Sequence, residues 1–168
     1  SDLEPLTMRP HWTLAVALSL FVALLLTAVP LPPAVNEWRP AWVPMVLAYW
    51  CLAAPERVGV LTGWLVGLVL DVLQGAILGQ HALALALVAY LAVIYHQRIR
   101  VFPLVQQSVV AGSIIFVYLL VTTAIYDLLG SRHYGLEHLL GAATSALLWP
   151  WCFVILRDLR RMAGLVQR

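Results

Sequence analysis

The sequence contains no lysine, and charge of either sign is sparse. Ten arginines and eight acidic residues are spread over 168 positions. Charged residues make up 11% of the chain and hydrophobic residues 62%, whereas a soluble domain carries about 25% charged residues. So few charges cannot cover a water-facing surface, so the composition predicts a polytopic membrane protein. A dispersed net charge of +2 also excludes a basic patch for nucleic acid.

Several reactive motifs are missing as well. Without lysine, the chain has no glycine–lysine phosphate loop and therefore no Walker-type nucleotide site. The two cysteines, Cys51 and Cys152, match no metal or redox spacing, and we interpret them as small apolar core residues. Ser113 and Ser145 lack the GxSG pattern of an intramembrane hydrolase, and serines in apolar helices usually bond to their own backbone. We expect no enzyme activity, no metal and no cofactor.

Six apolar stretches approach the roughly 20 residues that a membrane-spanning helix needs. They are Trp12–Val29, Trp38–Ala54, Val58–Leu78, Gly79–Tyr95, Pro103–Tyr126 and Leu136–Leu156. The predicted fold is therefore an all-α polytopic membrane protein with six transmembrane helices. We expect residues 1–8 to be an N-terminal extension or a cloning scar, residues 9–163 to form one transmembrane domain, and residues 157–168 to form an arginine-rich tail.

The arginines predict the orientation of these helices. With the N-terminus inside, eight arginines fall in cytoplasmic segments and two, Arg39 and Arg132, fall outside. This excess follows the positive-inside rule and places both termini in the cytoplasm. Five crossings would put the cluster of Arg157, Arg160 and Arg161 outside, which favours six. The cluster is either a topology anchor or a contact for anionic lipid or an acidic cytoplasmic partner.

A series of small residues runs through the third stretch. Every fourth residue belongs to it: Gly59, Gly63, Gly67, Asp71, Gly75 and Gly79. Residues four apart lie nearly above one another on an α-helix, so the first three glycines predict a groove for a closely packed helix. The last two glycines have rotated further and lie near the helix end.

Asp71 is an ionisable group at depth in this apolar stretch. A charge there costs several kcal/mol, so the carboxylate should face protein and be paired, hydrogen-bonded or protonated. Four side chains are candidate partners, namely Tyr49, Gln74, Gln80 and His81. The sequence leaves the choice among them open. A proton or ion relay is the alternative to a structural hydrogen bond at this position.

The middle of the chain combines these features in a specific order. The order runs Arg39-Pro40, Tyr49-Trp50, Pro55, Arg57-Val58-Gly59, Gly67, Asp71, Gly75 and LGQHAL at 78–83. Together with the later segment SALLWPWCFVILRDLRR, it resembles the MreD family of bacterial rod shape-determining membrane proteins over residues 9–163. The resemblance implies a fold similar to the six-helix substrate-binding subunits of ECF vitamin transporters.

The resemblance also implies a non-catalytic role in the bacterial inner membrane. Members of the family bind MreC, a single-span protein with a large periplasmic part, and link to MreB, RodA and its transpeptidase partner. We expect a scaffold whose groove at Gly59, Gly63 and Gly67 packs against a helix, with Asp71 and the Gly79–His81 turn shaping its outer end. Whether MreC or a helix of this chain fills the groove is open. The alternative is a small-solute or ion carrier with Asp71 in its pocket.

Overall fold

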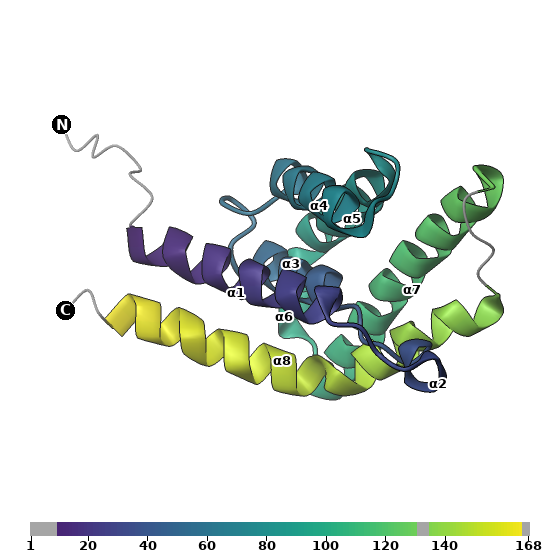
Figure 1. Ribbon diagram of the computed structural model, residues 1–168. Coiled ribbons are helices and arrows are strands. Elements are labelled where there is room, and N and C mark those ends of the chain that lie inside the picture. Colours follow the sequence, from purple (N-terminus) through teal and green to yellow (C-terminus); the bar gives the residue numbers. More distant parts are fainter. Residues whose placement is uncertain (1–9, 131–134, 166–168) are drawn as a thin grey trace.

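The computed structural model describes residues 10–130 and 135–165, and these ranges contain helices and no strand (Figure 1). The N-terminal extension 1–8 and the last residues of the arginine-rich tail lie outside them. The principal helices are α1 (Pro10–Ala28), α3 (Trp42–Ala53), α4 (Val60–Gln74), α5 (Gln80–Ile94), α7 (Leu104–Leu128) and α8 (Leu140–Leu165). Short segments connect them, namely α2 (Pro33–Asn36), α6 (His96–Val101) and the 3-10 helix η1 (Leu136–Leu139).

Each predicted apolar stretch overlaps one principal helix, but the bounds differ. Helix α3 begins at Trp42 rather than Trp38, and α8 continues to Leu165, through most of the predicted arginine-rich tail. The third predicted helix is shorter than expected. It was expected to continue to Leu78, whereas α4 ends at Gln74. Gly75 adopts the left-handed conformation with φ 64°, which terminates the helix. Gly79 has φ 101° and precedes α5. Residues 75–79 therefore form the turn of an antiparallel α4–α5 hairpin.

Two of the described helices are long and apolar enough to cross a membrane, α7 and the stretch 136–163 that contains α8. The apolar parts of the other four principal helices are shorter. The 15 residues of α4 or of α5 span about 22 Å, against a hydrocarbon core of about 30 Å. The count of six crossings and their orientation therefore stay predictions.

Helix α3 forms the centre of the molecule, which explains how a short apolar helix is accommodated. It packs against α1, α5, α7 and α8, and nearly all its residues are buried. Met45, Leu47, Trp50 and Cys51 expose no surface. A helix enclosed by protein does not have to match the thickness of a bilayer by itself.

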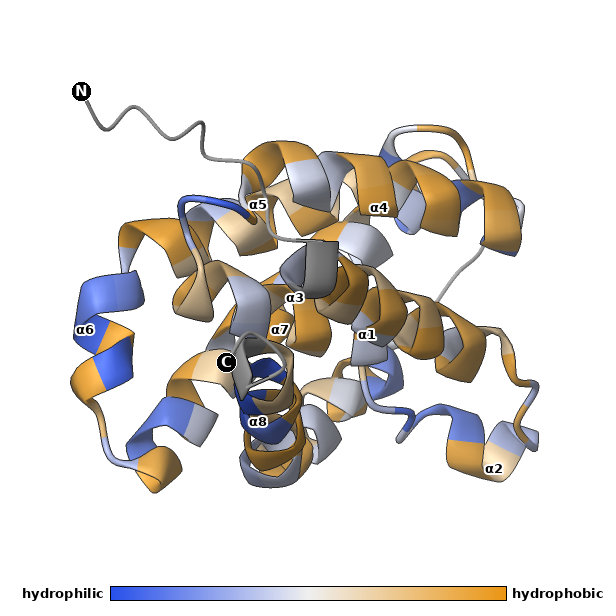
Figure 2. Cartoon of the chain, turned by 90° about the vertical axis from the view of Figure 1, so that its left-hand side faces the viewer, coloured by the Kyte–Doolittle hydropathy of each residue, from blue (hydrophilic) through white to orange (hydrophobic). Residues whose placement is uncertain are grey.

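The bundle has two distinct ends (Figure 1). Helix α1 begins and α8 ends at one of them. Helix α2, the turn at 75–79 and η1 lie at the other, which we call the α2 end. Hydrophobic residues make up most of the helices, and hydrophilic residues gather on α6, on part of α8 and in the loops (Figure 2). Large hydrophobic side chains are exposed on α1, α4, α5, α7 and α8. Such an apolar exterior is typical of a surface that contacts lipid or partner helices.

Candidate functional site

The glycine groove of α4 holds α5 of the same chain. A Cβ atom on Gly67 would lie 2.3 Å from the Cα atom of Ala82, and one on Gly63 would lie 2.8 Å from the carbonyl oxygen of Leu85. These distances leave no room for a side chain, so the helix backbones are in contact. At these two glycines, the helix in the groove is therefore one of the chain's own.

The other three glycines of the series do not take part in this contact. Gly59 precedes α4, and nothing lies within 4 Å of the position its Cβ would occupy. Gly75 and Gly79 have open space around them and supply the positive φ angles of the turn. The groove within the chain is therefore shorter than predicted, because Gly59 precedes α4, which begins at Val60.

Asp71 caps the N-terminus of α5 from the neighbouring helix. Its side chain exposes no surface. Oδ1 accepts the backbone N–H of His81 at 2.8 Å, and Oδ2 accepts those of Gly79 at 2.9 Å and Ala82 at 3.4 Å. Nδ1 of the His81 ring also lies 2.8 Å from Oδ1. The first N–H groups of a helix lack partners within it and carry the positive end of its dipole, so a carboxylate is stabilised there.

Among the four candidate side chains, His81 is the one in hydrogen-bond contact with Asp71. The Gln80 amide is buried without a hydrogen-bond partner in the described structure. Tyr49 packs against aromatic rings of α3 and α8, and Gln74 lines the cavity described below. The predicted partners were side chains alone, and the backbone N–H donors were missed. The sequence feature that could have indicated these backbone donors is the position of Asp71, just before the turn that leads into α5.

A cavity of about 320 Å³ lies at the α2 end. Its wall is formed by residues of α1, α2, α3, α4, α5, α7 and η1 and of the loop that joins α2 to α3. Its polar lining includes Asn36, Glu37, Arg39, Gln74, His81 and His138, and its apolar lining includes Trp42, Val43, Leu70 and Leu119. Asp71 is absent from this lining, although its partner His81 belongs to it. Asp71 therefore positions His81 in the cavity wall without lining the cavity itself.

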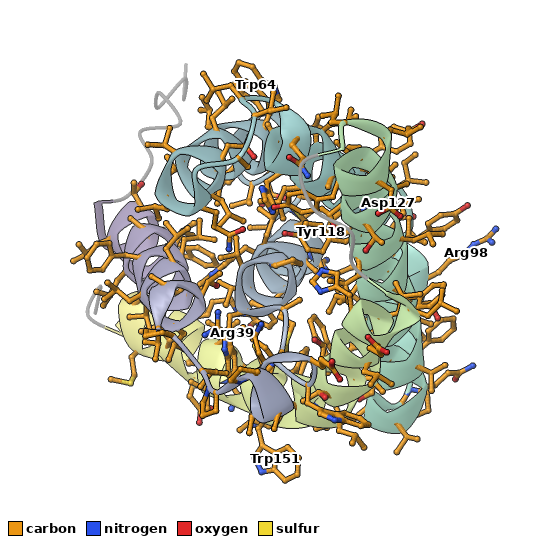
Figure 3. All side chains as sticks on the ribbon, turned by 45° about the vertical axis from the view of Figure 1, so that its right-hand side comes forward. Arg39, Trp64, Arg98, Tyr118, Asp127 and Trp151 are labelled. Carbon is orange, nitrogen blue, oxygen red and sulfur yellow. The ribbon has the colours of Figure 1, made fainter. Side chains whose placement is uncertain are left out.

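Arg39 provides a cation to this cavity, and its guanidinium is only partly paired. Nη1 donates to the carbonyl oxygen of Thr27 at 2.8 Å. Nε and Nη2 are buried and have no hydrogen-bond partner in the described part of the chain. Figure 3 shows Arg39 inside the ring of helices, whereas Arg98 points outward. From the sequence, Arg39 was expected to matter only for membrane topology. Arginine is disfavoured in the outer segments of membrane proteins, so the position of Arg39 in such a segment indicated a role other than orientation.

The serines considered for hydrolysis bond to their own helices, as expected. Ser113 Oγ donates to the carbonyl oxygen of Val109 at 2.9 Å. Ser145 Oγ donates to that of Gly141 at 2.7 Å and accepts the N–H of Ala41 at 2.9 Å. Neither serine has a histidine partner among these bonds. The described residues also contain no group of three His, Cys, Asp or Glu side chains that could hold a metal ion.

The arginines at the opposite end differ in their surroundings. In the cluster near the end of α8, Arg157 and Arg160 are half-buried and Arg161 is exposed. Arg100, which the sequence suggested only as a topology residue, donates to the carbonyl oxygens of Leu52 and Ala53 at 2.6 Å each. It therefore caps the C-terminus of α3, where carbonyl groups lack helical partners and the dipole is negative.

The helical fold, the apolar exterior and the two long apolar helices fit the class of helical membrane proteins. The sequence comparisons specify the family. A family profile described as rod shape-determining protein MreD matches residues 8–159. The chain is 35% identical over 149 residues to the Rod shape-determining protein MreD of Haemophilus influenzae, covering 88% of this chain and 92% of that protein. The chain belongs to the MreD family, which confirms the resemblance. No solved structure matches it, so the likeness to ECF subunits stays a prediction.

Proposed function

We propose that this protein is a non-catalytic scaffold of the cell-elongation machinery, which binds MreC in the bacterial inner membrane and helps to organise peptidoglycan synthesis. Membership of a rod shape-determining family supports a role in cell shape. The proposed contact surface for MreC is the cavity at the α2 end. The glycine groove is filled by α5 at Gly63 and Gly67, whereas this cavity offers both polar groups and free volume.

The orientation predicted from the arginines directs the cavity toward the periplasm. The α2 end is opposite to the helix ends at which the chain begins and finishes, and both termini are predicted to be cytoplasmic (Figure 1). The large part of MreC lies in the periplasm. The MreC segment next to its membrane span therefore lies at the same depth in the membrane as the cavity. MreB, RodA and the transpeptidase partner join the assembly directly or through MreC. The cluster at Arg157, Arg160 and Arg161 is placed for anionic lipid or an acidic cytoplasmic partner.

A pair of adjacent substitutions on α2 tests this placement. Asn36 lines the cavity and is exposed, whereas its neighbour Val35 is exposed but does not line it. Asn36→Trp places an indole at the cavity mouth, and Val35→Trp adds the same group outside it. With MreC co-expressed and the complex purified, we expect Asn36→Trp to lower the MreC-to-protein ratio about tenfold or more. Val35→Trp should leave the ratio unchanged. Equal ratios for both variants and the unaltered protein would refute the placement.

A small-solute carrier is the second candidate, and the cavity volume is the observation that favours it. About 320 Å³ lies at the lower end of the range for small-molecule sites. The proposed acid is not in this pocket, because both Asp71 oxygens bind the start of α5. Native mass spectrometry of the purified protein decides between the two. A stoichiometric small molecule that Asn36→Trp removes, without any change in MreC binding, would support the carrier.

A further inference from the structure

The unpaired groups of Arg39 lie on a single edge of its guanidinium. The planar group presents Nε–H and one N–H of Nη2 in parallel along that edge, and both nitrogens are buried without partners in the described structure. The remaining nitrogen, Nη1, is held by the carbonyl of Thr27, which fixes the plane of the group. Two parallel donors at this spacing match the two oxygens of a carboxylate.

No described residue of the chain supplies that carboxylate. Arg39 forms no salt bridge with the described acidic residues. Glu37 lines the same cavity but is exposed and lies beyond ion-pair distance. Asp71 is fully engaged with α5. A buried guanidinium stays charged, and leaving it unpaired is costly, so this edge of Arg39 lacks a counter-charge among the described residues.

We propose that Arg39 binds the carboxylate of an acidic side chain that the protein partner inserts into this cavity. The inference rests on the proposed function, because it names the group that the bound segment presents. The apolar lining by Trp42, Val43, Leu70 and Leu119 fits the rest of such a segment, with the acid at the depth of Arg39. A bidentate ion pair in this partly enclosed site would fix the register of the partner.

Three variants of the full chain, each co-expressed with MreC, test the inference. Arg39→Gln removes the charge and the fork, and Arg39→Lys keeps the charge but not the fork. Arg98→Gln removes an exposed arginine at the other end as the control. We expect Arg39→Gln to weaken MreC binding about thirtyfold or more and Arg39→Lys to weaken it less. Arg98→Gln should bind normally. Melting temperatures of the purified variants identify any loss of binding that comes from misfolding, and Arg39→Lys can still donate to the Thr27 carbonyl.

A charge exchange identifies the source of the anion. Arg39→Asp is combined with a set of MreC variants in which each acidic residue is changed singly to arginine. Recovery of the complex at one position supports the proposal and identifies the carboxylate. If no position restores binding, and wild-type protein retains an anionic phospholipid that Arg39→Gln loses, the anion is a lipid phosphate and the proposal is overturned. Full MreC binding by Arg39→Gln, with binding still lost in Asn36→Trp, overturns this inference and leaves the proposed function standing.

Discussion

The cap that Asp71 provides to α5 predicts a large effect of the substitution Asp71→Asn. The two side chains have nearly the same shape, but one carboxylate oxygen becomes an NH₂ group. In one orientation this NH₂ faces the N–H groups of Gly79 and Ala82, and in the other it faces the N–H and the ring of His81. Either way, buried donors lose their acceptor, and the start of α5 loses a negative charge.

The magnitude follows from these two losses. A buried donor left without a partner costs about 1–3 kcal/mol, and removing a charge from a helix N-terminus costs roughly 0.3–2 kcal/mol. We therefore expect Asp71→Asn to lower the free energy of unfolding by about 2–4 kcal/mol, or about 30- to 700-fold in the equilibrium constant. Asp158→Asn, which changes an exposed carboxylate on α8, is the matched control and should change it little.

Unfolding of the purified protein in mixed micelles by SDS titration, followed by circular dichroism, measures the change. Hydrogen exchange locates it, because the amides of Gly79, His81 and Ala82 should exchange faster in Asp71→Asn than in the unaltered protein. An unfolding free energy within about 0.5 kcal/mol of the unaltered protein, with unchanged protection of these amides, would refute the capping role.

Three further substitutions test the packing, each by the same SDS titration. Gly67→Ala forces α4 and α5 apart and should lower the free energy of unfolding by about 1–3 kcal/mol. Gly59→Ala, at a position with open space around it, should be nearly neutral. Equal effects of the two substitutions would contradict the backbone contact. Arg100→Gln removes the donors at the end of α3 and should cost about 1 kcal/mol, and a neutral result would dismiss that cap. Ser145→Ala should cost about 1–3 kcal/mol, because the N–H of Ala41 loses its acceptor, and unchanged stability would show that another group replaces it.

The positions of the helices could be predicted from the sequence, because long apolar stretches separated by Pro, Gly and charged residues leave few alternatives. Asp71 shows how far such reasoning reaches. The cost of an isolated charge correctly indicated a buried, hydrogen-bonded carboxylate, and His81 was among its four candidate partners. The choice among them depended on the turn at 75–79, whose positive φ angles bring the start of α5 back to Asp71.

The identity of the packed helix and the cavity could not be predicted in the same way. Four-residue glycine spacing indicates a smooth face but carries no information about which helix meets it. The spacing also continued past the end of α4, because a turn glycine and a groove glycine look the same in a sequence. The role of Arg39 depends on a wall formed by seven helical segments and a connecting loop, and no local pattern predicts such a long-range arrangement.

Site-specific photocrosslinking tests the placement of the partner at the α2 end most directly. A photoreactive amino acid is introduced at Asn36, at the cavity, and separately at Leu65, on the exposed apolar face of α4. Both variants are expressed in cells that make MreC, irradiated and probed for the crosslinked pair. We predict that MreC is captured from Asn36 and not from Leu65. Capture from Leu65 without capture from Asn36 would contradict a partner site in the cavity.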